Sequence, residues 1–315
     1  MSWSIHGYRE AGLGTAHPEQ WLTLLLDHAG WQLQWEGASG SQPLWPQGEA
    51  TPDHEWLLTR PGRDHGQLRL FRFTDRVPAP RAGADNWDTG GIFDLDVRVR
   101  NLKAWYVTLR ELGWRAISEP VDWPFGELQV REWLARGPDD VILALMQRLA
   151  PSLPSDAQPG AGFSAAFNSS QTVRDFNASL AFYEALGFRL MVRHEAPLGG
   201  RGGEVIGLSP DVASETTVAL AIMHPQAVLE GSVELVALPD RAGRDLSAAC
   251  GPARRGLNLL RFPVQGLDAL LQHLATTGIA STARARWDLP GWGEVEGVAV
   301  VSPDGAWLEL IEARA

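Results

Sequence analysis

Residues 179–188 read Ser179-Leu180-Ala181-Phe182-Tyr183-Glu184-Ala185-Leu186-Gly187-Phe188 and contain a pattern that recurs along the chain. The apolar side chains return at spacings of three and four residues, which predicts an amphipathic helix over 178–186. Gly187 ends this helix, because the position after the last turn needs a positive φ that glycine adopts without strain. A large apolar residue follows and leads into a strand predicted at 189–195.

The same combination of a helix, a glycine and a large apolar residue occurs three more times, at Gly30-Trp31, Gly113-Trp114 and Gly278-Ile279. Strands precede and follow each helix, which predicts four βαβββ units. The helices are predicted at 18–29, 102–112, 178–186 and 267–277. The strands are predicted, unit by unit, at 8–13, 31–36, 55–59 and 67–73; at 92–99, 116–118, 128–135 and 141–147; at 165–173, 189–195, 203–208 and 217–224; and at 257–264, 280–285, 293–302 and 306–311.

A segment rich in proline, serine and glycine, residues 150–162, separates the second unit from the third and predicts a linker. We therefore expect two domains of two units each, over 1–149 and 163–315, as the length of 315 residues also favours. The segment 225–256 allows an additional strand at 233–238. The glycine-rich run at 199–203 lacks the strand-to-helix context of a phosphate loop and is predicted to be a hairpin turn.

The composition excludes several classes of function. A net charge of −11 argues against a nucleic-acid partner, because phosphates require basic patches. The single cysteine, Cys250, excludes an internal disulfide and a zinc site built from cysteines. The N-terminus shows no secretory signal and no apolar run is long enough to span a bilayer, so we expect a cytoplasmic protein that does not bind membranes.

Three stretches resemble the vicinal-oxygen-chelate superfamily of glyoxalases, bleomycin-resistance proteins and extradiol dioxygenases. Val173-Arg174-Asp175 with the helix of 179–188 resembles its opening helix, and Ser302-Pro303-Asp304-Gly305-Ala306-Trp307-Leu308-Glu309-Leu310-Ile311-Glu312 resembles its closing strand. Residues 137–147 are a weaker copy of that ending. The resemblance implies an α+β fold in which paired βαβββ units form two cup-shaped, eight-stranded curved sheets with helices outside.

The resemblance also implies a divalent metal held by side chains on the first, fifth and eighth strands of a cup. The matching positions are Asn168, Leu259 and Glu309 in the C-terminal half and Ala11, Asp94 and Ala144 in the N-terminal half. None of them is a histidine, and one carboxylate with an amide holds iron or zinc poorly. We therefore expect no cofactor, and a divalent metal with Glu309 as a weak candidate ligand is the alternative.

Alternation along the strands predicts which side chains face the cups. Asp94, Asp96 and Arg98 share one inward face. The two aspartates suit a hard cation, a hydroxyl group, or an acid–base pair with separated pKa values. The alternative is that they pair with Arg98 or Arg9.

Four further inward side chains are Asn168, Ser170, Arg261 and Glu309. Glu309 is either a ligand or proton-transfer group, or it pairs with Arg261 across the cup and neutralises it. Tryptophan is abundant, with fourteen residues, and Trp123 lies in a predicted hairpin at a cup rim, where it suits stacking on an aromatic ligand. The predicted ligand-binding residues are thus Asp94, Asp96, Trp123, Asn168, Ser170, Arg261 and Glu309.

Three functions fit these observations. The first is metal-independent binding of a small molecule, an aromatic one included, by a monomer or homodimer. The second is a metal-dependent dioxygenase, lyase or isomerase with unusual ligands. The third is a scaffold whose cups are filled by its own side chains.

Overall fold

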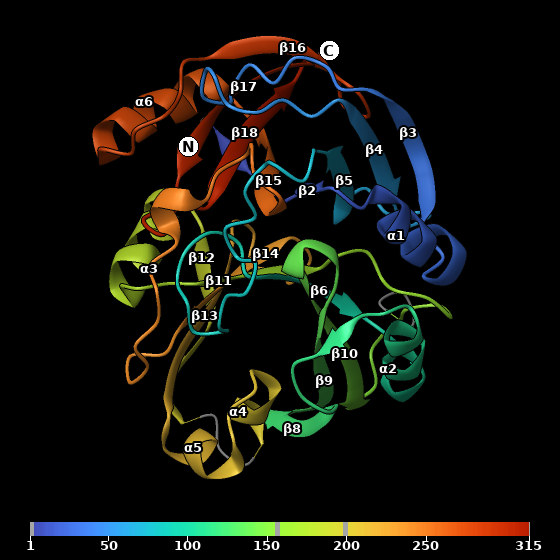
Figure 1. Ribbon diagram of the computed structural model, residues 1–315. Coiled ribbons are helices and arrows are strands. Elements are labelled where there is room, and N and C mark those ends of the chain that lie inside the picture. The colour runs from blue at the N-terminus through green and yellow to red at the C-terminus, as the bar shows by residue number, and fades with distance from the viewer. Residues whose placement is uncertain (1–2, 155–157, 198–200, 315) are drawn as a thin grey trace.

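The chain folds into two curved β-sheets that lie one above the other, with helices on their outer sides (Figure 1). This computed structural model describes residues 3–154, 158–197 and 201–314. Four consecutive βαβββ units are present, so the predicted α+β fold of two cup-shaped sheets is confirmed.

The first and fourth units build one sheet, which we call the 1/4 sheet. Its strand order is β16-β17-β18-β15-β2-β5-β4-β3, and β1 pairs with β15. The strands are β1 Ser4–Ile5, β2 Glu10–Thr15, β3 Gln32–Ala38, β4 His54–Thr59, β5 Gln67–Arg72, β15 Gly256–Gln265, β16 Ala285–Leu289, β17 Gly293–Val301 and β18 Trp307–Ala313.

The second and third units build the other sheet, which we call the 2/3 sheet. Its strand order is β12-β13-β14-β11-β6-β10-β9-β7, and β8 pairs with β9. The strands are β6 Asp94–Arg98, β7 Arg115–Ala116, β8 Val121–Phe125, β9 Leu128–Arg136, β10 Ile142–Ala150, β11 Asn168–Thr172, β12 Arg189–Pro197, β13 Thr217–His224 and β14 Ser232–Ala237.

One main helix of each unit packs against the convex side of the sheets. These helices are α1 Pro18–Leu22 with its continuation η1 Thr23–His28, α2 Leu102–Glu111, α3 Phe176–Ala185 and α6 Leu267–Thr277. Shorter helical segments are α4 Gly202–Val205, α5 Pro210–Glu215, η2 Pro138–Asp140 and η3 Ser247–Ala249. None of the helices in the described part of the chain is long and apolar enough to cross a membrane.

The main hydrophobic core lies between these helices and the strands, and it is continuous across both sheets. On β6, Leu95 and Val97 point into it, toward Leu102 and Leu109 of α2. Strand side chains alternate between faces, so this packing commits the remaining residues of β6 to the concave side. The alternation along β6 therefore places Asp94 and Asp96 on the concave side of the sheet.

The predicted pairing of the units is wrong. Instead of dividing at 150–162, both sheets draw on both halves of the chain: β2 pairs antiparallel with β15, and β6 pairs antiparallel with β11. Each unit presents its first strand as an open edge, and the local sequence does not say which other edge it meets. Complementary side chains on the two first strands determine which edges pair. Glu10, for example, lies opposite Arg261 and accepts a 2.6 Å hydrogen bond from it.

The third unit also differs from its prediction. The strand expected at 203–208 is absent, and α4 occupies the start of that segment. Val205 and Leu208 are three residues apart and both are buried, which suits a helix better than a strand. The additional strand expected at 233–238 is present as β14 and completes the unit. Of the predicted hairpin turn at 199–203, residues 199 and 200 lie outside the described residues.

Candidate functional site

The concave side of the 2/3 sheet encloses a cavity of about 270 Å³, which we call the open cup. Five of the seven predicted ligand-binding residues line it, namely Asp94, Asp96, Trp123, Asn168 and Ser170. A cavity of this kind, apolar over most of its wall with a few converging polar groups, is typical of small-molecule sites.

Four carboxylates line the open cup. Asp94 and Asp96 come from β6, Glu132 from β9 and Glu234 from β14. Alternation places the two aspartates on the same face, opposite to the face that packs on α2. Three different strands therefore bring acidic groups into the cavity, close enough to interact with one another.

Burial makes ionisation of these acids unfavourable. It raises the pKa of Asp94 to about 6, against hydrogen bonds from Ser170 and the charge of Arg81. It raises the pKa of Glu132 to about 7 and that of Glu234 to about 8, and nearby Asp94 adds to both shifts. The pKa of Asp96 is also raised, by burial first and then by repulsion from Asp94, Glu234 and Glu132. Near neutral pH the cluster consequently shares protons instead of carrying four full charges.

Each of three acids is oriented by a neutral donor. The Ser170 backbone N–H donates to Asp94 at 3.2 Å, and the Trp123 indole N–H donates to Glu132 at 3.0 Å. The Asn168 amide donates to Glu234 at 3.2 Å. Asn168 Oδ1 in turn accepts a 2.7 Å hydrogen bond from Ser232, which fixes the orientation of the amide. Three predicted site residues therefore serve as donors to acids.

Arginines do not neutralise this cluster as the alternative interpretation of Asp94 and Asp96 required. Arg98 forms an ion pair with Glu230 at 3.1 Å, and its guanidinium lies 3.9 Å from the ring centroid of Phe167. Arg9 donates to the backbone oxygen of Gly291 and stacks on the indole of Trp292, both in the turn between β16 and β17 of the 1/4 sheet. Arg148 lines the cavity, and its buried Nε has no hydrogen-bond partner among the described residues.

Aromatic and aliphatic side chains form the rest of the wall. Trp123 and Phe125 of β8 contact each other edge to face at 5.4 Å. Phe93 and Phe167, which flank β6 and β11, also line the cavity. Val205 of α4 adds an apolar contact from the third unit, next to the β8 hairpin of the second, as the proximity of α4 and β8 in Figure 1 shows.

The concave side of the 1/4 sheet, which we call the closed cup, is filled. Arg261 donates to Glu309 at 2.7 Å and to Glu10 at 2.6 Å. Arg69 donates to Glu10 at 2.7 Å and to Glu55 at 3.1 Å. All five side chains are at most 2% exposed. Burial opposes ionisation, yet Arg69 and Arg261 lower the pKa of Glu10 to about 2.

The segment between β3 and β4 covers this network. Trp45 is buried there and donates its indole N–H to Glu309 at 3.0 Å. Gln42 donates to Glu55 at 2.9 Å and accepts from Arg261. Arg261 and Glu309 thus form the charge pair that was the alternative to ligand binding, and they are not among the residues that line the open cup.

A metal triad does not fit these residues. The described part of the chain contains no group of three or more His, Cys, Asp or Glu side chains placed to hold one ion. The six positions matched to the superfamily's ligands also separate differently: Asn168, Asp94 and Ala144 lie in the 2/3 sheet, and Ala11, Leu259 and Glu309 lie in the 1/4 sheet. The one weak candidate, Glu309, is already engaged by Arg261 and two indoles.

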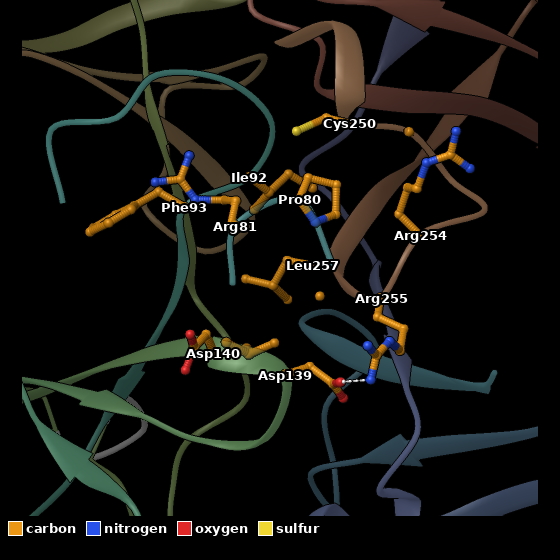
Figure 2. A pocket seen from close by; sticks show the side chains of 13 residues that line it. Pro80, Arg81, Ile92, Phe93, Asp139, Asp140, Cys250, Arg254, Arg255 and Leu257 are labelled. Carbon is orange, nitrogen blue, oxygen red and sulfur yellow. Dashed lines mark hydrogen bonds and ion pairs between the residues drawn. The ribbon is translucent and has the colours of Figure 1, made fainter. Parts of the chain in front are cut away.

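A much smaller cavity, about 20 Å³, lies between the two sheets beside Cys250 (Figure 2). Its cationic residues are committed: Arg255 pairs with Asp139 at 2.8 Å, and Arg254 pairs with Glu49. A space of this size holds about one water molecule. It therefore does not compete with the open cup as a ligand site.

Glu132, Glu234 and Arg148 line the open cup but were not predicted from the sequence. Glu132 lies on the same inward face of β9 as Leu128 and Leu134. The sequence feature that could have identified it was a single acid among apolar residues of one strand face. Glu234 belongs to β14, which the sequence offered only as an additional strand. Glu234 became a candidate only when the third unit was placed in one sheet with the second, whereas Glu132 belongs to the same unit as Asp94 and Asp96.

Comparisons with known proteins agree with this architecture. No family model matches the chain, and no curated protein matches it in sequence. Glyoxalase I from Zea mays superposes with a TM-score of 0.61 at 14% identity, covering 99% of this chain and 93% of that one. A point mutant of the same enzyme gives 0.62 at 15% identity, again over 99% and 93%. A proposed dioxygenase from Bacillus subtilis gives 0.59 at 11% identity, over 99% of this chain and 86% of that one.

At these identities the likeness concerns the fold. It spans the whole chain, including the first unit, which the sequence assigned only through the repeat. The resemblance stated from the sequence is thus confirmed, and the chain has the fold of the vicinal-oxygen-chelate superfamily.

Proposed function

We propose that this protein binds a small organic molecule in the open cup, without the metal triad typical of the fold. The observation that carries the proposal is the cavity of about 270 Å³, which is lined by four carboxylates and by mostly apolar side chains. Sites of this composition bury most of a small ligand and orient it through a few polar groups. The third possibility considered from the sequence, a self-filled scaffold, describes the closed cup and not this one.

The wall favours a ligand with a flat apolar body. Trp123, Phe125 and Phe167 present rings to the cavity, and aromatic rings gain most from offset or edge-to-face contacts with other rings. Met146 and Met191 add polarisable, adaptable side chains. A polar group of the ligand would meet the four acids.

A metal-dependent dioxygenase, lyase or isomerase remains the alternative. The fold shared with glyoxalase I from Zea mays supports this alternative. The described part of this chain contains no group of His, Cys, Asp or Glu side chains placed to hold the metal that it requires. Elemental analysis of protein purified without chelator tests it, because the alternative requires a stoichiometric metal. A cytoplasmic location and a monomeric or dimeric state stay predictions.

The test is a panel of small aromatic molecules in neutral, anionic and cationic forms, measured by thermal shift and by tryptophan fluorescence. Val236 lies in phase with Glu234 on β14 and lines the cavity, so Val236→Phe reduces its volume. Val107→Phe, on the solvent side of α2 where Val107 is 53% exposed, is the matched control. We expect at least one compound to bind the wild type and the control and to lose about tenfold or more in affinity for Val236→Phe.

Absence of binding by every compound, or affinities that Val236→Phe leaves unchanged, would contradict the proposal. A compound whose binding is lost in both variants equally would also contradict it, because the cavity would then not be the site.

A further inference from the structure

The two cups can be compared residue by residue through their strand registers. We call two residues equivalent when they occupy the same positions in the corresponding ladders of the 1/4 and 2/3 sheets. In the closed cup, Arg261 lies opposite Glu309 on β18 and opposite Glu10 on β2. In the open cup, Ser170 lies opposite Glu234 on β14 and opposite Asp94 on β6.

These ladders make Ser170 equivalent to Arg261. By the same registers, Glu234 is equivalent to Glu309 and Asp94 to Glu10. Both carboxylates of the closed cup that bind the Arg261 guanidinium are therefore retained in the open cup, and the arginine itself is replaced by a small residue.

The second arginine shows the same relation. Two residues after Glu10 on β2, Gly12 lies opposite Arg69; two residues after Asp94 on β6, Asp96 lies opposite Ala144. Ala144 is thus equivalent to Arg69.

One step further along, Phe71 lies opposite Glu55, and Met146 lies opposite Glu132. Glu132 is therefore equivalent to Glu55. All three carboxylates of the closed cup are present in the open cup, and neither of its two guanidinium groups is.

From this correspondence we propose that the open cup binds an organic cation, a guanidinium, amidinium or ammonium group on an apolar body, in the space that the closed cup fills with Arg69 and Arg261. The inference rests on the proposed function and specifies the charge of its ligand. The closed cup supplies the template, because its own occupants are cations bound by the equivalent carboxylates.

The geometry of that template suits a planar, donor-rich cation. The Arg261 guanidinium uses separate nitrogens for Glu309 and Glu10, and the Arg69 guanidinium bridges Glu10 and Glu55. Charge-assisted hydrogen bonds of this kind are stronger than neutral ones. In the open cup Ser170 and Ala144 carry no cationic group, so a ligand can supply one.

The balance of charge points the same way. Four carboxylates line the open cup, and Arg148 is the one basic side chain among its lining residues in the described part of the chain. Protons now offset the repulsion between these acids, as their raised pKa values indicate. A bound cation would take the place of those protons, and the aromatic rings would contact its apolar body.

Benzamidine, benzamide and benzoate test the proposal, because they share a ring and a planar head group but carry a positive, zero and negative charge. Isothermal titration at pH 8 is expected to show benzamidine binding at least about tenfold more tightly than benzamide, and benzoate more weakly than both. Glu234→Gln is expected to weaken benzamidine selectively and to leave benzamide within about twofold.

The second arm returns an arginine to the open cup. Ser170→Arg is expected to abolish benzamidine binding while the protein remains folded, because the new guanidinium can pair with Asp94 and Glu234 as Arg261 pairs with Glu10 and Glu309. Ser281→Arg, at an exposed position beside the 1/4 sheet, is the control and should bind benzamidine as the wild type does.

Equal or tighter binding of benzamide or benzoate would overturn the cation inference, and the proposed function would still stand if Val236→Phe abolished that binding. Stoichiometric binding of manganese chloride with no binding of benzamidine would likewise overturn it, since the cup would then attract a metal ion instead of an organic cation. Benzamidine binding that Ser170→Arg does not affect would overturn it as well.

Discussion

The closed cup and the open cup share a backbone plan and three carboxylates, and they differ in what neutralises those carboxylates. In the closed cup Arg69 and Arg261 are built into the sheet, and Trp45 covers them from the segment between β3 and β4. In the open cup Ala144 and Ser170 stand at the two arginine positions, and a cavity remains. Two built-in arginines and a covering segment thus distinguish the filled cup from the one with a cavity.

This difference shows how one repeat can serve structure or binding. Buried charges are tolerated when each has a partner of opposite sign, and removing one partner leaves an uncompensated charge. The closed cup meets that requirement internally. The open cup meets it with shared protons, which a ligand can displace.

The largest effect is expected for Arg261→Ser, which gives the closed cup the residue that the open cup has at Ser170. Glu10 and Glu309 would lose their shared guanidinium while buried, and the free energy of unfolding should fall by about 3–5 kcal/mol. Urea unfolding measures this loss. Arg72→Ser is the control, because the exposed Arg72–Asp53 pair should cost about 1 kcal/mol or less. Similar losses for the two variants would show that the closed cup does not depend on its internal cations.

The next effect concerns stability and pH in the open cup. Glu234 has a pKa of about 8 in the folded protein, against an ordinary value of 4.5. Between these values the folded protein holds a proton that the unfolded chain has released, so stability falls as pH rises from about 4.5 to 8. Glu234→Gln removes this contribution and should stabilise the protein at pH 8 by on the order of 1–3 kcal/mol, with little change at pH 5.

Urea unfolding at both pH values tests this, with Glu294→Gln as the control on an exposed part of β17. The control should shift stability equally at pH 5 and pH 8. Parallel pH profiles for Glu234→Gln and the wild type would contradict the raised pKa of Glu234.

A third effect links the acids to the proposed ligand. Benzamidine keeps its charge between pH 6 and 8, whereas Asp94, Glu132 and Glu234 have pKa values of about 6, 7 and 8. Its affinity should therefore rise with pH over this interval, by up to about tenfold per pH unit for each proton displaced.

Other charged or titratable groups near the cluster are Asp96 and Arg98 on β6, Arg148 on β10, Arg81, and the Tyr8 hydroxyl, whose pKa is raised by burial and then by Asp96. Titrations in two buffers of different ionisation enthalpy report the proton release directly. Benzamide is the control and should show no such slope. An affinity for benzamidine that is constant or higher at pH 6 would argue against proton displacement.

The smallest effect is expected at Trp123, which donates to Glu132 and also forms part of the wall. Trp123→Phe keeps a ring but removes the donor, so the benzamidine affinity at pH 7 should fall by about three- to tenfold. Trp292→Phe removes an indole donor to Glu10 in the closed cup. That variant should lower the free energy of unfolding and leave the benzamidine affinity unchanged. A lower affinity for Trp292→Phe, or an unchanged affinity for Trp123→Phe, would contradict the assignment of binding to the open cup alone.

Sequence periodicity was sufficient for the units and for the direction of many side chains. Helix stripes ended by glycine indicated four βαβββ units, and strand alternation placed Asp94, Asp96, Asn168 and Ser170 on inward faces that the structure brings into one cavity. These features depend on residues close together in the chain. Local spacing therefore contains the information needed to predict them.

Only the tertiary structure decided which units share a sheet. First strands offer similar open edges, so the choice between partners depends on contacts between distant residues, such as Glu10 with Arg261. That choice separated Arg261 and Glu309 from Asn168 and brought Glu234 beside Asp94 and Glu132. The sequence determined that acids would face inward. The pairing of strands across the chain determined which acids lie beside an arginine and which line a cavity. The reason is that charge neutralisation depends on side chains that are neighbours in space.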